Sequence, residues 1–182
     1  MKKIIIIAAA FIGFTTAAKA QNASATAQQT VQLQLSNALE ISFTANNSAT
    51  GNTVALPFTT ANDYANGVQS AAQQLKVRSN KNFNVTVKAN AATFSVTNNG
   101  TTSTSTMPAS VLEVKVSANG TGGAVAGSYN NYTDLNTTAA NLITNGTYGG
   151  NQTFSVMYNA APGFAYPAGT YNMDVVYTAT QQ

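Results

Sequence analysis

Apolar residues recur at every second position through most of this chain, and this period-two pattern constrains its fold more than any other feature. Successive side chains of a β-strand point to opposite faces of the sheet, whereas an amphipathic helix repeats its apolar residues every three to four positions. Each alternating run therefore predicts a short strand with one apolar face. The apolar residues of these runs are Val31, Leu33 and Leu35; Leu39, Ile41 and Phe43; Val54, Leu56 and Phe58; Leu75 and Val77; Phe83, Val85 and Val87; Phe94 and Val96; Leu112, Val114 and Val116; Phe154, Val156 and Tyr158; and Tyr171, Met173, Val175 and Tyr177.

Short turn-forming stretches rich in Asn, Gly and Pro separate these runs. Antiparallel strands need only such short connections, whereas parallel strands need crossovers of a dozen or more residues. The sequence therefore predicts an all-β antiparallel sandwich of about 7–10 short strands. Residues 117–152 are expected to form a long surface loop with one weak strand at Leu142–Ile143, and the helix candidates are Ala61–Ala72 and Tyr132–Leu142.

The first 20 residues have the three parts of a secretory signal. Two lysines precede an uncharged apolar run, Ile4–Phe14, and Ala18–Ala20 has the small-residue pattern of a cleavage site. The apolar run is shorter than the roughly 20 residues that a membrane-spanning helix needs. We therefore expect residues 1–20 to be removed on export, without a transmembrane anchor. Residues 21–182 are then expected to form a single domain in the periplasm, and later at the cell surface or outside the cell.

The whole sequence has eight Lys and Arg against five Asp and Glu, a net charge of +3. Three of the lysines lie in residues 1–20, so the exported domain has no net charge. Nucleic-acid binding requires a cationic surface, and we expect no nucleic-acid partner. Four cations lie on one expected hairpin, and we interpret them as a solvated face, with an acidic polysaccharide or membrane surface as the alternative partner. These four are Lys76, Arg78, Lys81 and Lys88.

The sequence contains no Cys and no His. Their absence removes the usual general base, the usual nucleophile–base pairs and the common zinc ligands. The five acids are scattered along the sequence, whereas a glycosidase needs two facing carboxylates and calcium needs several clustered oxygens. We therefore expect a protein that is not an enzyme and has no cofactor or metal site.

Residues 21–36 form an N-terminal extension of the predicted domain. A small, polar lead precedes the strict alternation of Val31, Leu33 and Leu35 with polar residues. A strand attached in this way can pair within its own sandwich or enter the open edge of a neighbouring copy. Donation from head to tail does not close into a ring, so it builds filaments.

The C-terminal run Tyr166-Pro167-Ala168-Gly169-Thr170-Tyr171 leads into the last alternating strand. This run resembles the C-terminal strand of spore coat U-type and related fimbrial subunits. Ser36–Ile41 is similar to the N-terminal region of the same group, and exported proteins of the Bacteroidetes are similar along most of their length. The resemblance implies an immunoglobulin-like sandwich, secretion with a periplasmic chaperone and an outer-membrane usher, and homopolymerisation by strand exchange. Spore coat U-type subunits commonly carry cysteines and this chain has none, so a self-complete sandwich is the alternative.

Two candidate functions follow. The first is a structural subunit of a surface filament, polymerising by β-strand donation, and the second is a secreted adhesion module for glycan or matrix. The donor strand would be Val31, Leu33 and Leu35, and the C-terminal strand motif comprises Gly169, Tyr171, Met173, Val175 and Tyr177. Loop aromatics can stack on sugars or anchor a partner, and the candidate ligand contacts of the adhesion module are Tyr148, Phe164 and Tyr166.

Overall fold

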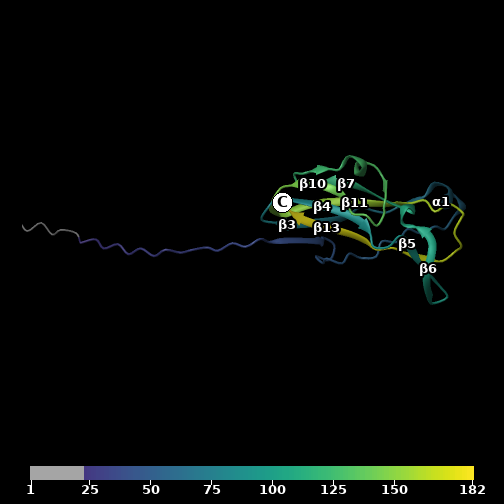
Figure 1. The fold of residues 1–182 in the computed structure, drawn as a ribbon, viewed down its shortest axis with the longest axis horizontal. Coiled ribbons are helices and arrows are strands. Elements are labelled where there is room, and N and C mark those ends of the chain that lie inside the picture. The colour runs from purple at the N-terminus through teal and green to yellow at the C-terminus, as the bar shows by residue number, and fades with distance from the viewer. Residues whose placement is uncertain (1–22) are drawn as a thin grey trace, which may run out of the picture. The chain divides into compact units, whose positions relative to one another are not determined.

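The computed structural model of the chain describes residues 23–182 (Figure 1). The predicted leader, residues 1–20, and the predicted new N-terminus at Gln21 lie outside the described residues. The chain divides into two units after Gln34. In the described part of the first unit, residues 23–34 are exposed and form neither helix nor strand. No helix in residues 23–182 combines the length and apolar character needed to cross a membrane.

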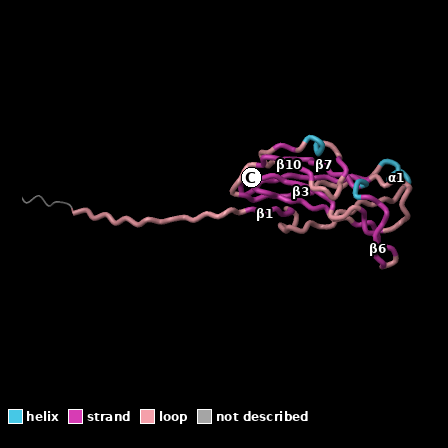
Figure 2. Tube along the Cα trace, in the orientation of Figure 1, coloured by secondary structure: helices cyan, strands magenta, loops and turns pink. Residues whose placement is uncertain are grey.

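The second unit contains three antiparallel sheets, which confirms the prediction of an all-β antiparallel sandwich. Figure 2 shows that strands and loops make up most of this unit and that its helices are short. The first sheet has the strand order β1-β3-β11-β7-β9, with β2 beside β11. Its strands are β1 (Leu39–Phe43), β2 (Val68–Gln69), β3 (Gln73–Ser79), β7 (Leu112–Asn119), β9 (Thr133–Asp134) and β11 (Gly149–Ala160). The second sheet has the order β13-β4-β10-β8 and consists of β4 (Phe83–Ala89), β8 (Ala124–Val125), β10 (Ala140–Gly146) and β13 (Val175–Gln181).

A smaller third sheet has the order β12-β5-β6 and is built from β5 (Thr93–Asn98), β6 (Thr101–Pro108) and β12 (Thr170–Asn172). The helices are α1 (Ala61–Asn66) and the 3-10 turns η1 (Ala109–Val111) and η2 (Gly127–Asn130). Thr60 caps α1, because its hydroxyl accepts from the Asp63 N–H while the Asp63 carboxylate accepts from the Thr60 N–H. The main-chain hydrogen bonds from Thr60 and Thr59 lower the pKa of Asp63.

The hydrophobic core is formed by the inward-facing residues of β3, β4, β7, β10 and β11. Every second residue of β4 is buried, as the alternation predicts for a strand with one face toward the core. Fully buried side chains from both large sheets meet there, including Leu75, Phe83, Val114 and Phe154.

One side of the sandwich, here named the closed side, is covered by chain that crosses between the two large sheets. The chain leaves the second sheet at β8, forms η2 and enters the first sheet at β9. Tyr129 of η2 and Leu135 just after β9 are buried in the core cluster. Main-chain hydrogen bonds fix this crossing, from Ala126 N–H to the Leu142 carbonyl (3.0 Å) and from Leu135 N–H to the Leu112 carbonyl (2.9 Å).

Three expectations about local structure are wrong. The expected weak strand at Leu142–Ile143 lies in β10, but residues 117–152 also contain β8 and β9 rather than one long loop, and the helix candidate Tyr132–Leu142 forms β9 and the start of β10. The candidate Ala61–Ala72 is helical only from Ala61 to Asn66. β8 and β9 escaped detection because two residues are too few to show an alternation, and both strands depend on main-chain hydrogen bonds to their neighbours.

Candidate functional site

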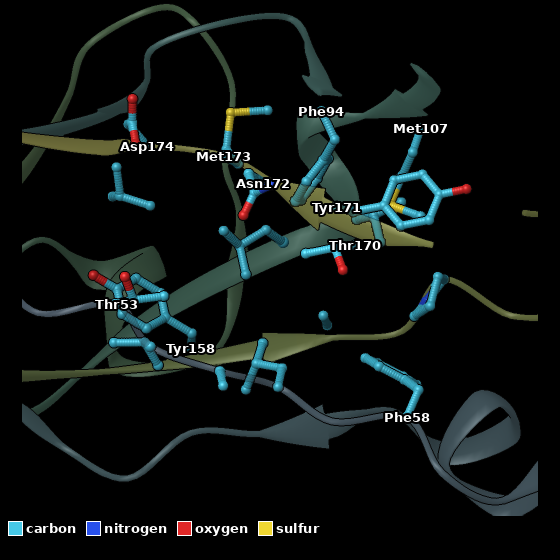
Figure 3. A pocket seen from close by; sticks show the side chains of 18 of the residues that line it. Thr53, Phe58, Phe94, Met107, Tyr158, Thr170, Tyr171, Asn172, Met173 and Asp174 are labelled. Carbon is cyan, nitrogen blue, oxygen red and sulfur yellow. The ribbon is translucent and has the colours of Figure 1, made fainter. Parts of the chain in front are cut away.

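The side opposite the crossing, here named the open side, contains a cavity of about 830 Å³. One wall is residues 51–58, which follow β1, and the other is residues 170–175, from β12 to the start of β13. Figure 3 shows Thr53 and Phe58 on one side of this cavity and Tyr171 and Met173 on the other. A second cavity of about 220 Å³ lies between β1 and β13 and shares Phe43, Ala49 and Val175 with the first. We call the two together the cleft.

Residues 51–58 line the cleft but form no strand, so the expectation of a strand at Val54–Phe58 is wrong. The side chains of Val54–Phe58 nevertheless alternate between core and solvent, as the sequence predicts. Val54, Leu56 and Phe58 are partly buried against the core cluster, while the residues between them are exposed. The main chain of residues 51–58 makes no hydrogen bond to other main chain within residues 23–182. This wall therefore has a sheet-like side-chain pattern and a free backbone.

The opposite wall contains the C-terminal motif. The sequence predicts one strand through Tyr171, Met173, Val175 and Tyr177, but the structure divides it between two sheets: β12 pairs with β5, and β13 pairs with β4. The break falls at Asp174, whose N–H and carbonyl bond to Asn90. Gly169 packs close to β5, where an added methyl group would meet Asn98 and Val96. The motif thus bends the chain from the third sheet to the second and leaves its apolar residues along the cleft.

Tyr177 of β13, in the second sheet, contacts side chains of the first sheet. Its hydroxyl is 2.9 Å from that of Tyr158, and its ring meets Phe43 edge-on at 6.2 Å and Phe154 at 6.4 Å. Burial, and then the neighbouring Tyr158, raise the pKa of Tyr177 well above its ordinary value. Burial also raises the pKa of Tyr158. Both hydroxyls therefore stay protonated at neutral pH, and their contact holds β13 to Tyr158 of β11.

Ser42 of β1 lines the smaller cavity and is 2% exposed. Its hydroxyl has no hydrogen-bond partner within the described part of the chain. A buried polar group without a partner costs about 1–3 kcal/mol. The cleft wall therefore keeps hydrogen-bonding capacity that the rest of the described chain does not use.

The expected donor strand is exposed in this structure. Val31 is 77% exposed, Leu33 82% and Leu35 89%, and Thr30–Ser36 forms no strand. Large apolar side chains are seldom left in water as a group, because each gains about 1.5–3 kcal/mol from full burial. This segment thus carries three apolar side chains, at every second position, that are available for burial elsewhere.

The candidate aromatic contacts do not form one site. Tyr148 lies beside Asn82 at the β3–β4 turn, with its N–H 3.3 Å from the Asn82 amide oxygen. Phe164 stacks on Tyr64 of α1 at 5.5 Å, and Tyr166 lines the cleft. Because α1 lies near the start of β3 and Asn82 lies just beyond its end, the sandwich separates Tyr148 from the other two. Phe164, 71% exposed, is left as a single exposed aromatic beside the mouth of the cleft.

The four cations also divide between surfaces. β3 and β4 belong to different sheets, so the expected hairpin carrying Lys76 and Lys88 does not form. Arg78 lies 3.6 Å from the Glu40 carboxylate, and the Lys76 ammonium donates to Asn47 at 2.9 Å. The interpretation as solvated side chains fits these partners.

Two of the acids are closer than the sequence suggests. Glu113 of β7 lies opposite Asp134 of β9, and the Asn159 amide donates to Glu113 at 2.5 Å. Asp134 is therefore on a strand and not in a loop as expected. Within the described residues, no three side chains of the metal-ligating types form a cluster.

Comparison with known proteins gives only a distant structural likeness. No protein-family model matches the chain, and no curated protein matches it. Among solved structures, the chain is similar to one described as a family 123 glycoside hydrolase from Clostridium perfringens, in a study of glycolipid glycan hydrolysis. The identity is 15%, the TM-score is 0.35, and the match covers 79% of this chain and 25% of that chain. The chain therefore spans about a quarter of that enzyme, and this likeness carries no argument about activity.

Several residues of the cleft were not among the sequence candidates. Phe94, Met107 and Tyr158 form part of its lining. The alternation placed Phe94 and Tyr158 on apolar faces, but it could not tell a closed core from an open one. Met107 is the second-last residue of β6, a Thr- and Ser-rich strand that has no apolar alternation.

Proposed function

We propose that this protein is a structural subunit of a surface filament, in which the N-terminal strand of one copy enters the cleft of the next. The observation that carries the proposal is the cleft itself, which lies between two sheet edges and is lined by partly buried apolar residues. The exposed segment with Val31, Leu33 and Leu35 supplies an occupant of matching pattern. The role is structural rather than catalytic.

A strand suits this cleft better than a compact ligand does. Residues 51–58 offer a free backbone, and strand addition to such an edge gains main-chain hydrogen bonds while alternate side chains fill pockets. Val31 to Leu35 span the same number of residues as Val54 to Phe58, about 13 Å in an extended chain. Burial of the three apolar side chains contributes about 1.5–3 kcal/mol each to the free energy of binding. The cost of ordering the segment reduces this contribution.

Export and partners follow from the same proposal. A leader over residues 1–20 directs the chain to the periplasm and then to the cell surface or outside the cell. The resemblance to fimbrial subunits makes a periplasmic chaperone and an outer-membrane usher the partners during assembly. In the assembled form each copy is both donor and acceptor, a head-to-tail contact that does not close.

The proposal is tested with mature protein carrying Leu33→Arg, which places a charge among the three donated side chains. Wild-type protein is expected to give multimers that survive SDS and dissociate on heating, and Leu33→Arg to abolish them. Gln32→Arg is the matched control, because it adds the same charge on the other face of the same strand. A wild-type protein that remains monomeric, or a Leu33→Arg variant that polymerises normally, would contradict strand donation.

A secreted adhesion module is the second candidate, and the exposed Phe164 beside Tyr64 favours it. An exposed aromatic ring can stack on a sugar or anchor a partner protein. Binding on a glycan array that Phe164→Ala removes, by a protein that is monomeric in solution, supports this candidate and contradicts the filament.

A further inference from the structure

Within residues 23–182, the edge strands of the three sheets differ in how they are protected from pairing with another molecule. β8 and β9 have two residues each and adjoin the crossing on the closed side, and β12 has three. β1 carries Glu40, which pairs with Arg78, and it lies beside β13, whose own free edge borders the cleft. β6 is different, because it has eight residues and pairs only with β5.

The half of β6 next to its turn lacks the usual protections of an edge strand, whereas the other half has a proline and a register shift. Natural edges are guarded by charges, by proline, by bulges or by being short. No charged residue occurs from Ala89 to Leu112, and Pro108 and the register shift both lie at the end away from the turn. The turn is formed by Asn99 and Gly100, both with positive φ (49° and 80°), as in the two-residue turn that keeps strands in register. Thr101–Thr104 is therefore a regular, exposed and uncharged edge.

The side chains of β6 suit pairing with an identical strand. Every residue from Thr101 to Thr106 is Thr or Ser, so both faces carry hydroxyls. Hydroxyl pairs across strands are favourable, and one already links Thr97 of β5 to Thr102 at 2.8 Å. An antiparallel copy that pairs through Thr101–Thr106 places Thr or Ser opposite Thr or Ser, without any repulsion between charges.

We propose that β6 is a homotypic docking edge, on which β6 of a second copy pairs antiparallel and extends the third sheet across a twofold axis. The same strand of both copies makes the contact, as in other twofold interfaces. The second copy is the favoured occupant because a charged partner would meet no countercharge on this edge. This contact does not use the cleft, so it is independent of strand donation.

The size of the contact determines whether it can join free molecules or only molecules already held in filaments. Eight residues on each side bury less than the roughly 1,200–2,000 Å² of a stable interface. Two free molecules therefore pair weakly, whereas copies arrayed along a filament reinforce one another by effective concentration. The expected consequence is side-by-side association of filaments.

A single introduced thiol tests this edge, because the chain contains no cysteine. Mature protein with Ser103→Cys is expected to form disulfide-linked dimers under mild oxidation at least about tenfold faster than Thr137→Cys, an exposed residue remote in sequence from β6. Both variants are made in the Leu33→Arg background, so that strand donation does not contribute. Equal cross-linking rates would overturn the proposal for β6 and leave the filament proposal untouched.

A second variant removes the pairing group rather than adding a reporter. In a two-residue hairpin Asn98 and Thr101 form the closing hydrogen-bonded pair, so the N–H of Thr104 points to the free edge. Adding Thr104→Pro to Ser103→Cys is expected to return cross-linking to the rate of the Thr137→Cys control, with an unchanged circular dichroism spectrum. Fast cross-linking that persists in a folded Thr104→Pro variant contradicts pairing through this edge.

Discussion

On the closed side of the sandwich, Tyr129 and Leu135 lie beneath the crossing from β8 to β9 with 4% and 1% of their surface exposed, whereas on the open side Leu56 and Met173 are only partly buried beside a cavity. Both sides join the same two sheets. The closed side has two-residue edge strands tied by main-chain hydrogen bonds to the core strands. The open side has a free backbone over residues 51–58 and an unpartnered hydroxyl at Ser42 among the described residues. The closed side is covered by residues of the same chain, and we infer that the open side is covered by a segment from a second copy.

The largest expected effect compares one leucine on each side. Leu135→Ala opens a cavity in a closed core and is expected to lower the free energy of unfolding by about 2–5 kcal/mol. Leu56→Ala loses less, about 1–2 kcal/mol, because Leu56 is partly exposed and already borders a cavity. Urea denaturation of monomeric mature protein in the Leu33→Arg background measures both. Equal losses at the two positions would mean that the open side is as well packed as the closed side.

A smaller effect is expected at Tyr177, which links β13 to β11. Tyr177→Phe removes the hydroxyl contact with Tyr158 and is expected to cost about 0.5–1.5 kcal/mol near neutral pH. Because the folded-state pKa of Tyr177 is raised, its contribution to stability is complete below the unfolded pKa of about 10 and is lost as the pH rises above it. Thermal unfolding from pH 8 to pH 11 should show a steeper alkaline loss in the wild type than in Tyr177→Phe. Parallel curves would mean that Tyr177 is accessible to water.

The smallest effect sharpens the comparison at Ser42. Ser42→Ala removes a buried hydroxyl that has no partner within residues 23–182, so the free subunit is expected to gain up to about 1 kcal/mol. Chemical denaturation of the variant in the Leu33→Arg background measures the change. Destabilisation by Ser42→Ala would show that the hydroxyl is satisfied in the free subunit, for example by bound water.

The sequence predicted the fold class because alternation directly reports which face of a strand is buried. β1, β3, β4, β5, β7 and β11 lie where apolar alternation placed them. β6 and β8 were missed because Thr101–Pro108 and Ala124–Val125 have no such alternation. The run at Val54–Phe58 was misread for the opposite reason, since it has the side-chain pattern of a strand but no pairing partner in the described chain.

The candidate site was predicted only in part. The C-terminal motif does lie along the cleft, yet its division between two sheets depends on contacts of Asp174 with Asn90, a residue 84 positions away. The sequence did not show that Tyr148 lies apart from Phe164 and Tyr166, because spacing along the chain does not say which end of a sandwich a loop occupies.

By itself, the sequence determined an all-β domain whose residues 21–182 have no net charge, and the alternation of Val31, Leu33 and Leu35, because strand faces and net charge are local or additive properties. Only the tertiary structure decided that the two sides of the sandwich differ. Whether an edge is covered depends on where chain far away in the sequence returns: η2 and Leu135 fill one side, while a cavity remains on the other. That choice is made by packing and main-chain pairing between distant segments, which local patterns do not encode.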